Sequence, residues 1–135
     1  MHDQPAYEAR TRDVVVRVRP SYLAGQSDPE GGRWVWAYHV EIENQGGATL
    51  QLLARRWSIV DGLGRTEEVR GPGVVGEQPV IGPGQSFSYA SGCPLGTPSG
   101  SMSGGYYMTD ETGQTFEVEI PAFSLDVPDP RRRLN

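Results

Sequence analysis

The stretch that decides the fold is RWVWAYHVEIEN, residues 33–44. Its residues alternate with a period of two, which is typical of a half-buried β-strand. Glu41 and Glu43 occupy the face that we expect to meet water. The other face carries the large apolar side chains, which are Trp34, Trp36, Tyr38, Val40 and Ile42.

Similar alternation recurs in shorter stretches on both sides of this segment. The chain has 135 residues, and its 18 glycines and 11 prolines separate these stretches as turn signals. No stretch keeps a helical period. The pattern predicts an all-β fold of about seven strands, most simply a β-sandwich, with an up-and-down barrel as the alternative. The remaining expected strands are 13–19, 49–60, 66–69, 86–89, one that carries Met102, Tyr106 and Met108, 114–120 and 123–127.

Three local features qualify this pattern. The apolar phase changes within 49–60 at Arg55 and Arg56, which predicts a bulge or a switch between sheets. Pro121 cannot donate to a ladder, so we expect it at an edge or a bulge. The stretch 93–100 is expected to be a loop.

Composition limits the architecture to one domain. We expect a flexible segment over 1–12, the folded domain over 13–127 and a C-terminal tail over 128–135. No apolar run is long enough for a transmembrane helix, and no leader-like N-terminus is visible, so a cytoplasmic protein is expected. Cys93 is the single cysteine, which excludes an internal disulfide and a cysteine-based zinc site.

The charge balance argues against nucleic acid as a partner. The formal net charge is −5, and all 12 basic residues are arginines. A protein that follows phosphates usually carries a basic face, whereas here the only basic run is 131–133, on the tail. The absence of lysine also excludes P-loop and Schiff-base chemistry.

A glycine-rich stretch, GPGVVG at 71–76, fits the spacing G-x-G-x-x-G. A dinucleotide site would need a helix directly after it, and Pro79 and Pro83 forbid that helix. Two interpretations remain. The favoured one is that the glycines hold positive φ in an irregular loop over 70–84 at a sheet edge. The other is that the backbone N–H groups of the loop bind an anion.

Other polar residues also allow both a functional and a structural interpretation. Arg55, Arg56 and Arg70 could gather to bind a phosphate or carboxylate, although packing of Arg55 or Arg56 on an aromatic ring is favoured. His39 and Cys93 are the only internal pair for nucleophilic chemistry, and we expect no enzyme. The carboxylates are expected to face solvent, and no metal site or cofactor is predicted. The cation candidates are Glu41/Glu43, Glu117/Glu119 and Asp110/Glu111.

Several ordered segments resemble the ApaG family, from Val14 to Leu125. They are YHVEIEN (38–44), WSIVDGLGRTEEV (57–69), RGPGVVGEQPVIGPG (70–84), FSYASGCPL (87–95), GSMSGGYYM (100–108) and FEVEIPAFSL (116–125).

The resemblance implies a fibronectin type III-like, immunoglobulin-like β-sandwich and no established catalytic residues. It also implies a bacterial protein whose loss is linked to cobalt resistance and magnesium efflux, and whose gene neighbours those for a diadenosine tetraphosphatase and an rRNA methyltransferase. The same domain in F-box proteins and in a partner of a DNA polymerase subunit looks like an interaction module. A chain without a membrane span could affect ion efflux only indirectly.

The sequence therefore predicts a non-enzymatic module that binds an unknown protein partner and is linked indirectly to Co2+/Mg2+ homeostasis. The expected surfaces are the glycine loop and an unpaired sheet edge, which could also build a homodimer. The alternative is a binding protein for pyrophosphate or dinucleoside polyphosphates. The candidate binding residues are Arg56, Arg70, Gly71, Gly73 and Gly76.

Overall fold

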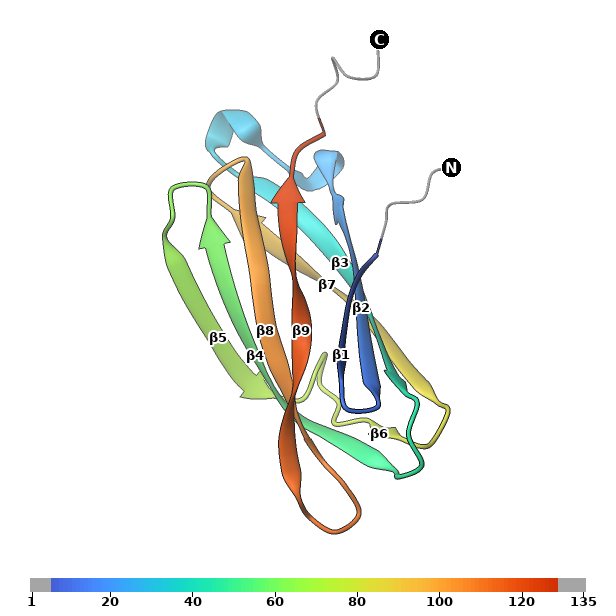
Figure 1. The fold of residues 1–135 in the computed structure, drawn as a ribbon. Coiled ribbons are helices and arrows are strands. Elements are labelled where there is room, and N and C mark those ends of the chain that lie inside the picture. Colours follow the sequence, from blue (N-terminus) through green and yellow to red (C-terminus); the bar gives the residue numbers. More distant parts are fainter. Residues whose placement is uncertain (1–5, 129–135) are drawn as a thin grey trace.

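Alternating apolar residues place two antiparallel sheets face to face (Figure 1). The structure, a computed structural model, describes residues 6–128. Two short 3-10 helices, η1 (Ala24–Gln26) and η2 (Pro29–Gly31), lie between the second and third strands. The strands are β1 (Tyr7–Thr11), β2 (Val14–Tyr22), β3 (Trp34–Asn44), β4 (Leu50–Asp61), β5 (Thr66–Pro72), β6 (Val80–Ile81), β7 (Ser86–Leu95), β8 (Ser99–Thr109) and β9 (Thr115–Asp126).

The order of strands is β1-β2-β3-β7 in the first sheet and β5-β4-β8-β9 in the second, where β6 also pairs with β4. All pairs are antiparallel. Two separate sheets make a sandwich, so the predicted all-β fold is confirmed and the barrel alternative is wrong. The described residues contain more strands than the seven or so expected.

The core lies between the sheets and is built by the alternation of β3. Trp36, Tyr38, Val40 and Ile42 are buried, as predicted. The Tyr38 and Trp57 rings meet edge to face at 5.2 Å across the sandwich, and a pair of this kind contributes about 0.5–1.5 kcal/mol beyond its burial. The indole N–H of Trp36 donates to the carbonyl oxygen of Asp126 at 2.9 Å and so joins the two sheets.

Both predicted irregularities are present. The β4–β8 register shifts between Leu52 and Ala54, just before the arginines at which the apolar phase changes. Pro121 lies on the edge strand β9, where the β8–β9 register shifts between Met102 and Gly104. These bulges let each strand keep its apolar residues in the core on both sides of the shift.

The N-terminal strand was not expected from the sequence. Residues 7–11, inside the segment expected to be flexible, form β1 and pair with Val14–Val18 of β2. The hairpin turns at Arg12, which has a φ of +53°. The alternation of apolar and polar residues in β1 is short and weak, and its strand conformation is stabilised by pairing with β2. Residues 1–5 and 129–135, including most of the expected tail, lie outside the described residues.

The expected loop over 93–100 is a second difference. Strand β7 continues to Leu95, and Ser99 already begins β8. Glycine and proline give the second half of β7 little strand propensity of its own. Its pairing with Trp34–Ala37 of β3 supplies the order that propensity lacks.

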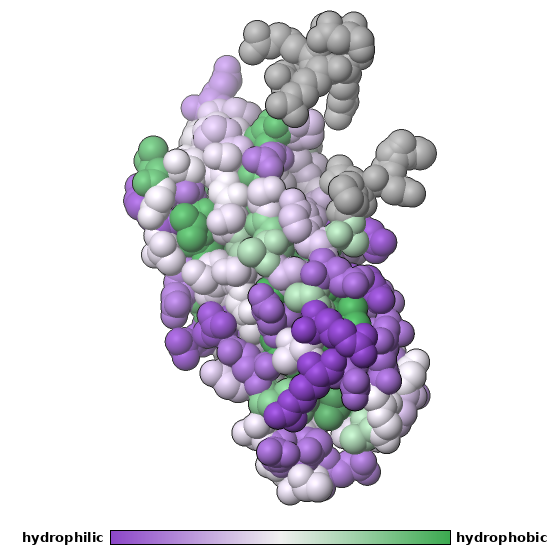
Figure 2. Space-filling view, in the orientation of Figure 1, coloured by the Kyte–Doolittle hydropathy of each residue, from purple (hydrophilic) through white to green (hydrophobic). Residues whose placement is uncertain are grey.

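The two long sides of the sandwich differ. Near β1 and β9 the side is closed, because the Tyr7 hydroxyl bonds the Ser124 hydroxyl at 3.0 Å and the Glu119 N–H donates to Thr11 Oγ1 at 3.0 Å. Strongly hydrophilic surface gathers over β1 in Figure 2. On the opposite side, β5 and β7 are the last strands of their sheets and do not pair with each other.

Candidate functional site: the glycine loop and the open edge of β5 and β7

The glycine loop is a tight turn packed onto β4. Gly73 and Gly76 have positive φ of +60° and +81°, as expected, whereas Gly71 lies in β5 without positive φ. The N–H groups of Val74 and Glu77 each donate to the carbonyl oxygen of the other residue at 2.8 Å, which closes a two-residue turn. The segment after the turn leads into β6, in agreement with the exclusion of a dinucleotide-binding helix.

The same loop has few donors left for an anion. The Gly73 N–H donates to the carbonyl oxygen of Leu53 at 2.8 Å, the N–H groups of Val74 and Glu77 are used in the turn, and Pro72 has none. Arg55 Nη1 donates to the carbonyl oxygens of Pro72 and Gly73 at 3.0 Å each. The geometry therefore gives no specific support to a pyrophosphate site in this loop.

The three arginines do not gather on one surface. Arg56 and Arg70 lie opposite each other in the β4–β5 ladder, while the neighbouring Arg55 faces the space between the sheets. Arg56 pairs with Glu117 at 3.1 Å, and Arg70 pairs with Glu68 at 3.4 Å.

The expected stacking of Arg55 or Arg56 on a ring is wrong. Among residues 6–128, the arginine that lies over an aromatic ring is Arg12, whose Cζ is 4.3 Å from the centroid of the Phe116 ring.

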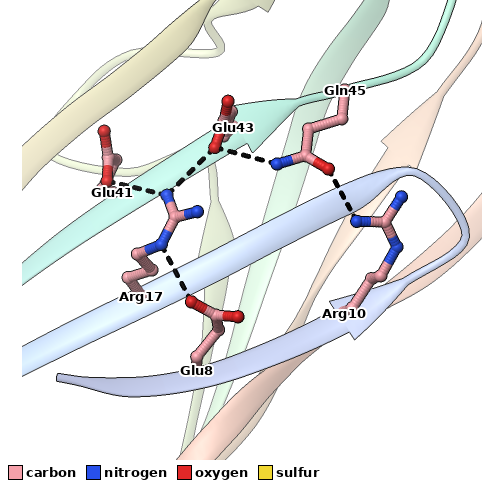
Figure 3. A network of polar contacts seen from close by, with 6 residues as sticks. All are labelled: Glu8, Arg10, Arg17, Glu41, Glu43 and Gln45. Carbon is pink, nitrogen blue, oxygen red and sulfur yellow. Dashed lines mark hydrogen bonds and ion pairs between the residues drawn. The ribbon is translucent and has the colours of Figure 1, made fainter.

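Glu41 and Glu43, which were cation candidates although no metal site was predicted, contact an arginine of their own sheet (Figure 3). Arg17 donates to Glu8, Glu41 and Glu43 at 3.0 Å each. Hydrogen bonds from Gln45 and Arg17 lower the pKa of Glu43. The guanidinium of Arg17, itself in the first sheet, thus binds these carboxylates.

Asp110, another of the acidic candidates, is similarly engaged. Asp110 accepts from the N–H groups of Thr112 and Gln114 and from the Thr112 hydroxyl, so it orders the β8–β9 turn. These hydrogen bonds, led by that of the hydroxyl, lower the pKa of Asp110. No group of three or more His, Cys, Asp or Glu side chains that could hold a metal ion occurs within residues 6–128.

His39 and Cys93 do not meet. His39 is exposed on the outer face of the first sheet, whereas Cys93 is buried on its inner face. Burial raises the pKa of the Cys93 thiol to about 11, and the charge of Glu67 acts in the same direction. The thiol is therefore protonated near neutral pH and is separated from the imidazole by the sheet itself.

The unpaired sheet edge that the sequence predicts is best represented by β7. The Asn44 N–H donates to the Gln85 carbonyl oxygen at 2.9 Å, which sets the phase of the β3–β7 ladder. Because antiparallel strands bond at alternate residues, Ser88, Ala90 and Gly92 point their N–H and C=O groups away from β3. Pro94, which has no N–H, falls on the same outward phase.

A pocket of about 340 Å³ opens between the edges of β5 and β7. Its wall on the second sheet has three successive levels. They are formed by the cross-strand pairs Arg55/Gly71, Trp57/Val69 and Ile59/Glu67. A cation, an apolar surface and a carboxylate therefore follow one another along the pocket.

A tyrosine cluster lies at the Arg55 end of this pocket. Tyr106 pairs with Arg55 in the β4–β8 ladder, and its hydroxyl is hydrogen-bonded to that of Tyr89 from β7. Burial raises the pKa of both phenols, against the opposing charge of Arg55. The phenols remain neutral, and Arg55 supplies the positive charge at this end.

Sequence reasoning missed Glu67 and the outward positions of β7. The sequence does contain one indication of an unprotected edge, because no charged residue occurs between Glu77 and Asp110. An edge strand placed in that stretch necessarily lacks the charges that usually protect edges.

The fold and this open edge define an all-β, immunoglobulin-like sandwich protein. None of the helices in the described part of the chain is long and apolar enough to cross a membrane. The chain belongs to the ApaG family, since the model of the ApaG domain matches residues 24–110.

Related proteins match this chain in sequence over nearly its whole length. Protein ApaG of Mesorhizobium japonicum is 57% identical over 129 residues, covering 96% of this chain and 99% of the relative. Protein ApaG of Rhodospirillum centenum is 60% identical with the same coverage. A crystal structure of a protein named ApaA, from Bordetella pertussis, superposes with a TM-score of 0.84 at 49% identity, covering 86% of this chain and 94% of that one.

Proposed function

We propose that this protein is a non-enzymatic interaction module that binds an extended segment of a partner protein along the edge of β7. Its link to Co2+/Mg2+ homeostasis, which the family resemblance implies, would then run through that partner. The observation that carries the proposal is the open, uncharged edge of β7 with backbone groups directed outward at Ser88, Ala90 and Gly92.

The other long edge strands of the sandwich are protected and β6 has only two residues, which makes the exception at β7 informative. Charged side chains, prolines and bulges discourage an edge from pairing with another chain. Strand β7 carries no charged residue and has proline only near its end. The protecting residues elsewhere are Glu8 and Arg10 in β1, Glu67, Glu68 and Arg70 in β5, and Glu117, Glu119 and Pro121 in β9.

Strand addition fits the energetics of this edge. Each backbone hydrogen bond to an incoming strand contributes about 0.5–1.5 kcal/mol net, and three residues offer both a donor and an acceptor. Association and ordering of the peptide offset much of this gain. Backbone pairing alone therefore supports weak binding, and side-chain contacts must add to it.

An Ala90→Pro variant tests the proposal. The Ala90 N–H points away from β3, so proline there removes a donor that an incoming strand needs without removing a β3–β7 hydrogen bond. Ala90→Thr is the matched control, because it keeps the N–H and suits a strand.

The measurement is cross-linking in bacterial extract, with the cross-linked positions mapped by mass spectrometry. Wild type and Ala90→Thr should cross-link one partner along β7, and Ala90→Pro should lose it. Retention by Ala90→Pro, or cross-links that map to β1 and β9 instead, would contradict the proposal. A cross-link between two copies through β7 would identify the homodimer as the occupant.

A further inference from the structure

We infer that the segment bound at β7 carries side chains in the order base–x–apolar–x–acid, which face Glu67, Val69 and Arg55 in turn. This inference rests on the proposed function and adds the chemistry of the partner to it.

An added strand would direct every second side chain into the pocket. Tyr89, Ser91 and Cys93 of β7 face the space between the sheets. In an antiparallel pair, directly opposite residues share a face of the sheet. Three alternate residues of the partner, opposite these positions, therefore point into the pocket.

The spacing of the pocket matches that of an extended peptide. Arg55, Trp57 and Ile59 follow one another at every second residue of β4 and are paired with Gly71, Val69 and Glu67. Alternate residues of any strand are about 6.6 Å apart. Inward side chains at positions i, i+2 and i+4 of the partner can thus meet the three levels one by one.

The ends of the pocket can be assigned along β7. Arg55 lies at the level of Tyr89, because Arg55 pairs with Tyr106 and the Tyr106 hydroxyl bonds that of Tyr89. Glu67 lies toward the Cys93 end, since it lines this pocket with Cys93 and also lines the adjoining pocket with Pro94 and Leu95. Val69 and Trp57 occupy the level between them.

The two charges at the ends are available to a partner. Neither Arg55 nor Glu67 belongs to an ion pair within residues 6–128. Arg55 is held in place by the carbonyl oxygens of Pro72 and Gly73, so the cation is preorganised. An acid opposite Arg55 and a base opposite Glu67 complete the charge pattern.

The direction of the partner follows from the sheet. Every pair in the first sheet is antiparallel, and antiparallel pairing is slightly more stable per residue. A segment antiparallel to β7 passes Cys93 first and Tyr89 last. Its base therefore precedes its acid in the chain.

A second copy of this chain fits the pocket less well. Antiparallel pairing of β7 with another β7 would bring Tyr89, Ser91 and Cys93 to the inward positions, and none of these carries a charge at neutral pH. The charge pattern favours a different protein as the partner.

Three capped peptides provide the test, titrated into the full-length, 15N-labelled protein and followed by amide chemical shifts. The matched peptide is Thr-Lys-Thr-Val-Thr-Glu-Thr, the reversed one is Thr-Glu-Thr-Val-Thr-Lys-Thr, and the third has acid at both charged positions. The matched peptide should bind about tenfold more tightly than the reversed one, because reversal replaces two attractive contacts by two repulsive ones. The largest shifts should occur at Ser88, Ala90 and Gly92.

A Glu67→Lys variant sharpens the test, because Glu67 is exposed and its replacement does not disturb the core. In this variant the peptide with acid at both positions should become the tightest ligand. Equal affinity of the matched and reversed peptides, with shifts still on β7, would overturn the charge pattern while leaving strand addition intact. Tighter binding of the reversed peptide would overturn the direction. No binding of any peptide at millimolar concentration would overturn the inference, while Ala90→Pro separately decides the proposed function.

Discussion

Replacing Gly73 by alanine is expected to destabilise the protein much more than replacing Gly76, although both glycines have positive φ. A Cβ at Gly76 would meet open space, whereas a Cβ at Gly73 would collide with the carbonyl group of Glu77. That carbonyl accepts the hydrogen bond that closes the turn at Val74. Both substitutions therefore force alanine into a left-handed backbone conformation, but only the one at Gly73 also makes the new Cβ collide with the backbone of Glu77.

The magnitudes can be worked from these contacts. A left-handed conformation costs a non-glycine residue about 1–2 kcal/mol, and restriction of the unfolded chain returns about 0.4–1 kcal/mol. Gly76→Ala should thus cost about 1 kcal/mol. Gly73→Ala adds the turn hydrogen bond, about 1 kcal/mol, and part of the burial of Val74, which contributes about 1.5–3 kcal/mol when complete. Its total should be about 3 kcal/mol.

Thermal unfolding followed by circular dichroism measures the difference. At about 4 °C per kcal/mol for a domain of this size, Tm should fall by roughly 4 °C for Gly76→Ala and by about 12 °C for Gly73→Ala. Equal losses would refute the role of the collision. A Gly73→Ala variant that melts like wild type would refute the structural account of the loop as a whole.

Three further outcomes are expected. Val75 has a φ of +43° at the first central position of the turn, where asparagine is preferred, so Val75→Asn should raise Tm by a few degrees; a lower Tm would contradict the turn geometry. Burial raises the pKa of Cys93 to about 11 from an ordinary 9.0. Iodoacetamide at pH 8 should therefore alkylate the native protein about 100-fold more slowly than the urea-unfolded chain. Mass spectrometry can measure both rates, and similar rates would contradict a buried thiol. Arg17→Met should raise the pKa of Glu43, which the native contacts hold below 4.5. In wild type, the stability that this carboxylate contributes is present above about pH 4.5 and is lost as the pH falls through the lowered pKa. The variant should therefore lose more stability at pH 7 than at pH 3, and an unchanged titration of the Glu43 carboxyl by NMR would contradict this.

The part of the fold that sequence predicts is the part with strong alternation. The long strand over 33–44 and the phase changes at Arg55 and Pro121 follow from the period of two, because a buried face tolerates no slip. The strand Tyr7–Thr11 and the second half of β7 escape prediction for the opposite reason. Their residues are small, polar or conformationally unfavourable, and pairing with β2 and β3 decides their structure.

For the candidate site, too, the sequence predicts some features and leaves others to the structure. Adjacent residues of a regular strand face opposite ways, but the phase change predicted at Arg55 and Arg56 left open whether they share a surface, and the structure places them on opposite faces. The positive φ of Gly73 and Gly76 was predictable from turn chemistry. The open edge was not, because the identity of the last strand in each sheet depends on topology, and only the structure brings Glu67 and β7 to the two sides of one pocket.

The closure of the sandwich along β1 and β9 also determines where attachments can be made. The described chain starts at β1 and ends just after β9, and each of these strands is the edge farthest from the open side. The points where a fluorophore, an affinity tag or a second domain would connect to the described strands therefore lie on the side of the sandwich opposite β7. Fusions at both ends should leave strand addition unhindered, whereas an insertion into the turn between β7 and β8 would obstruct it.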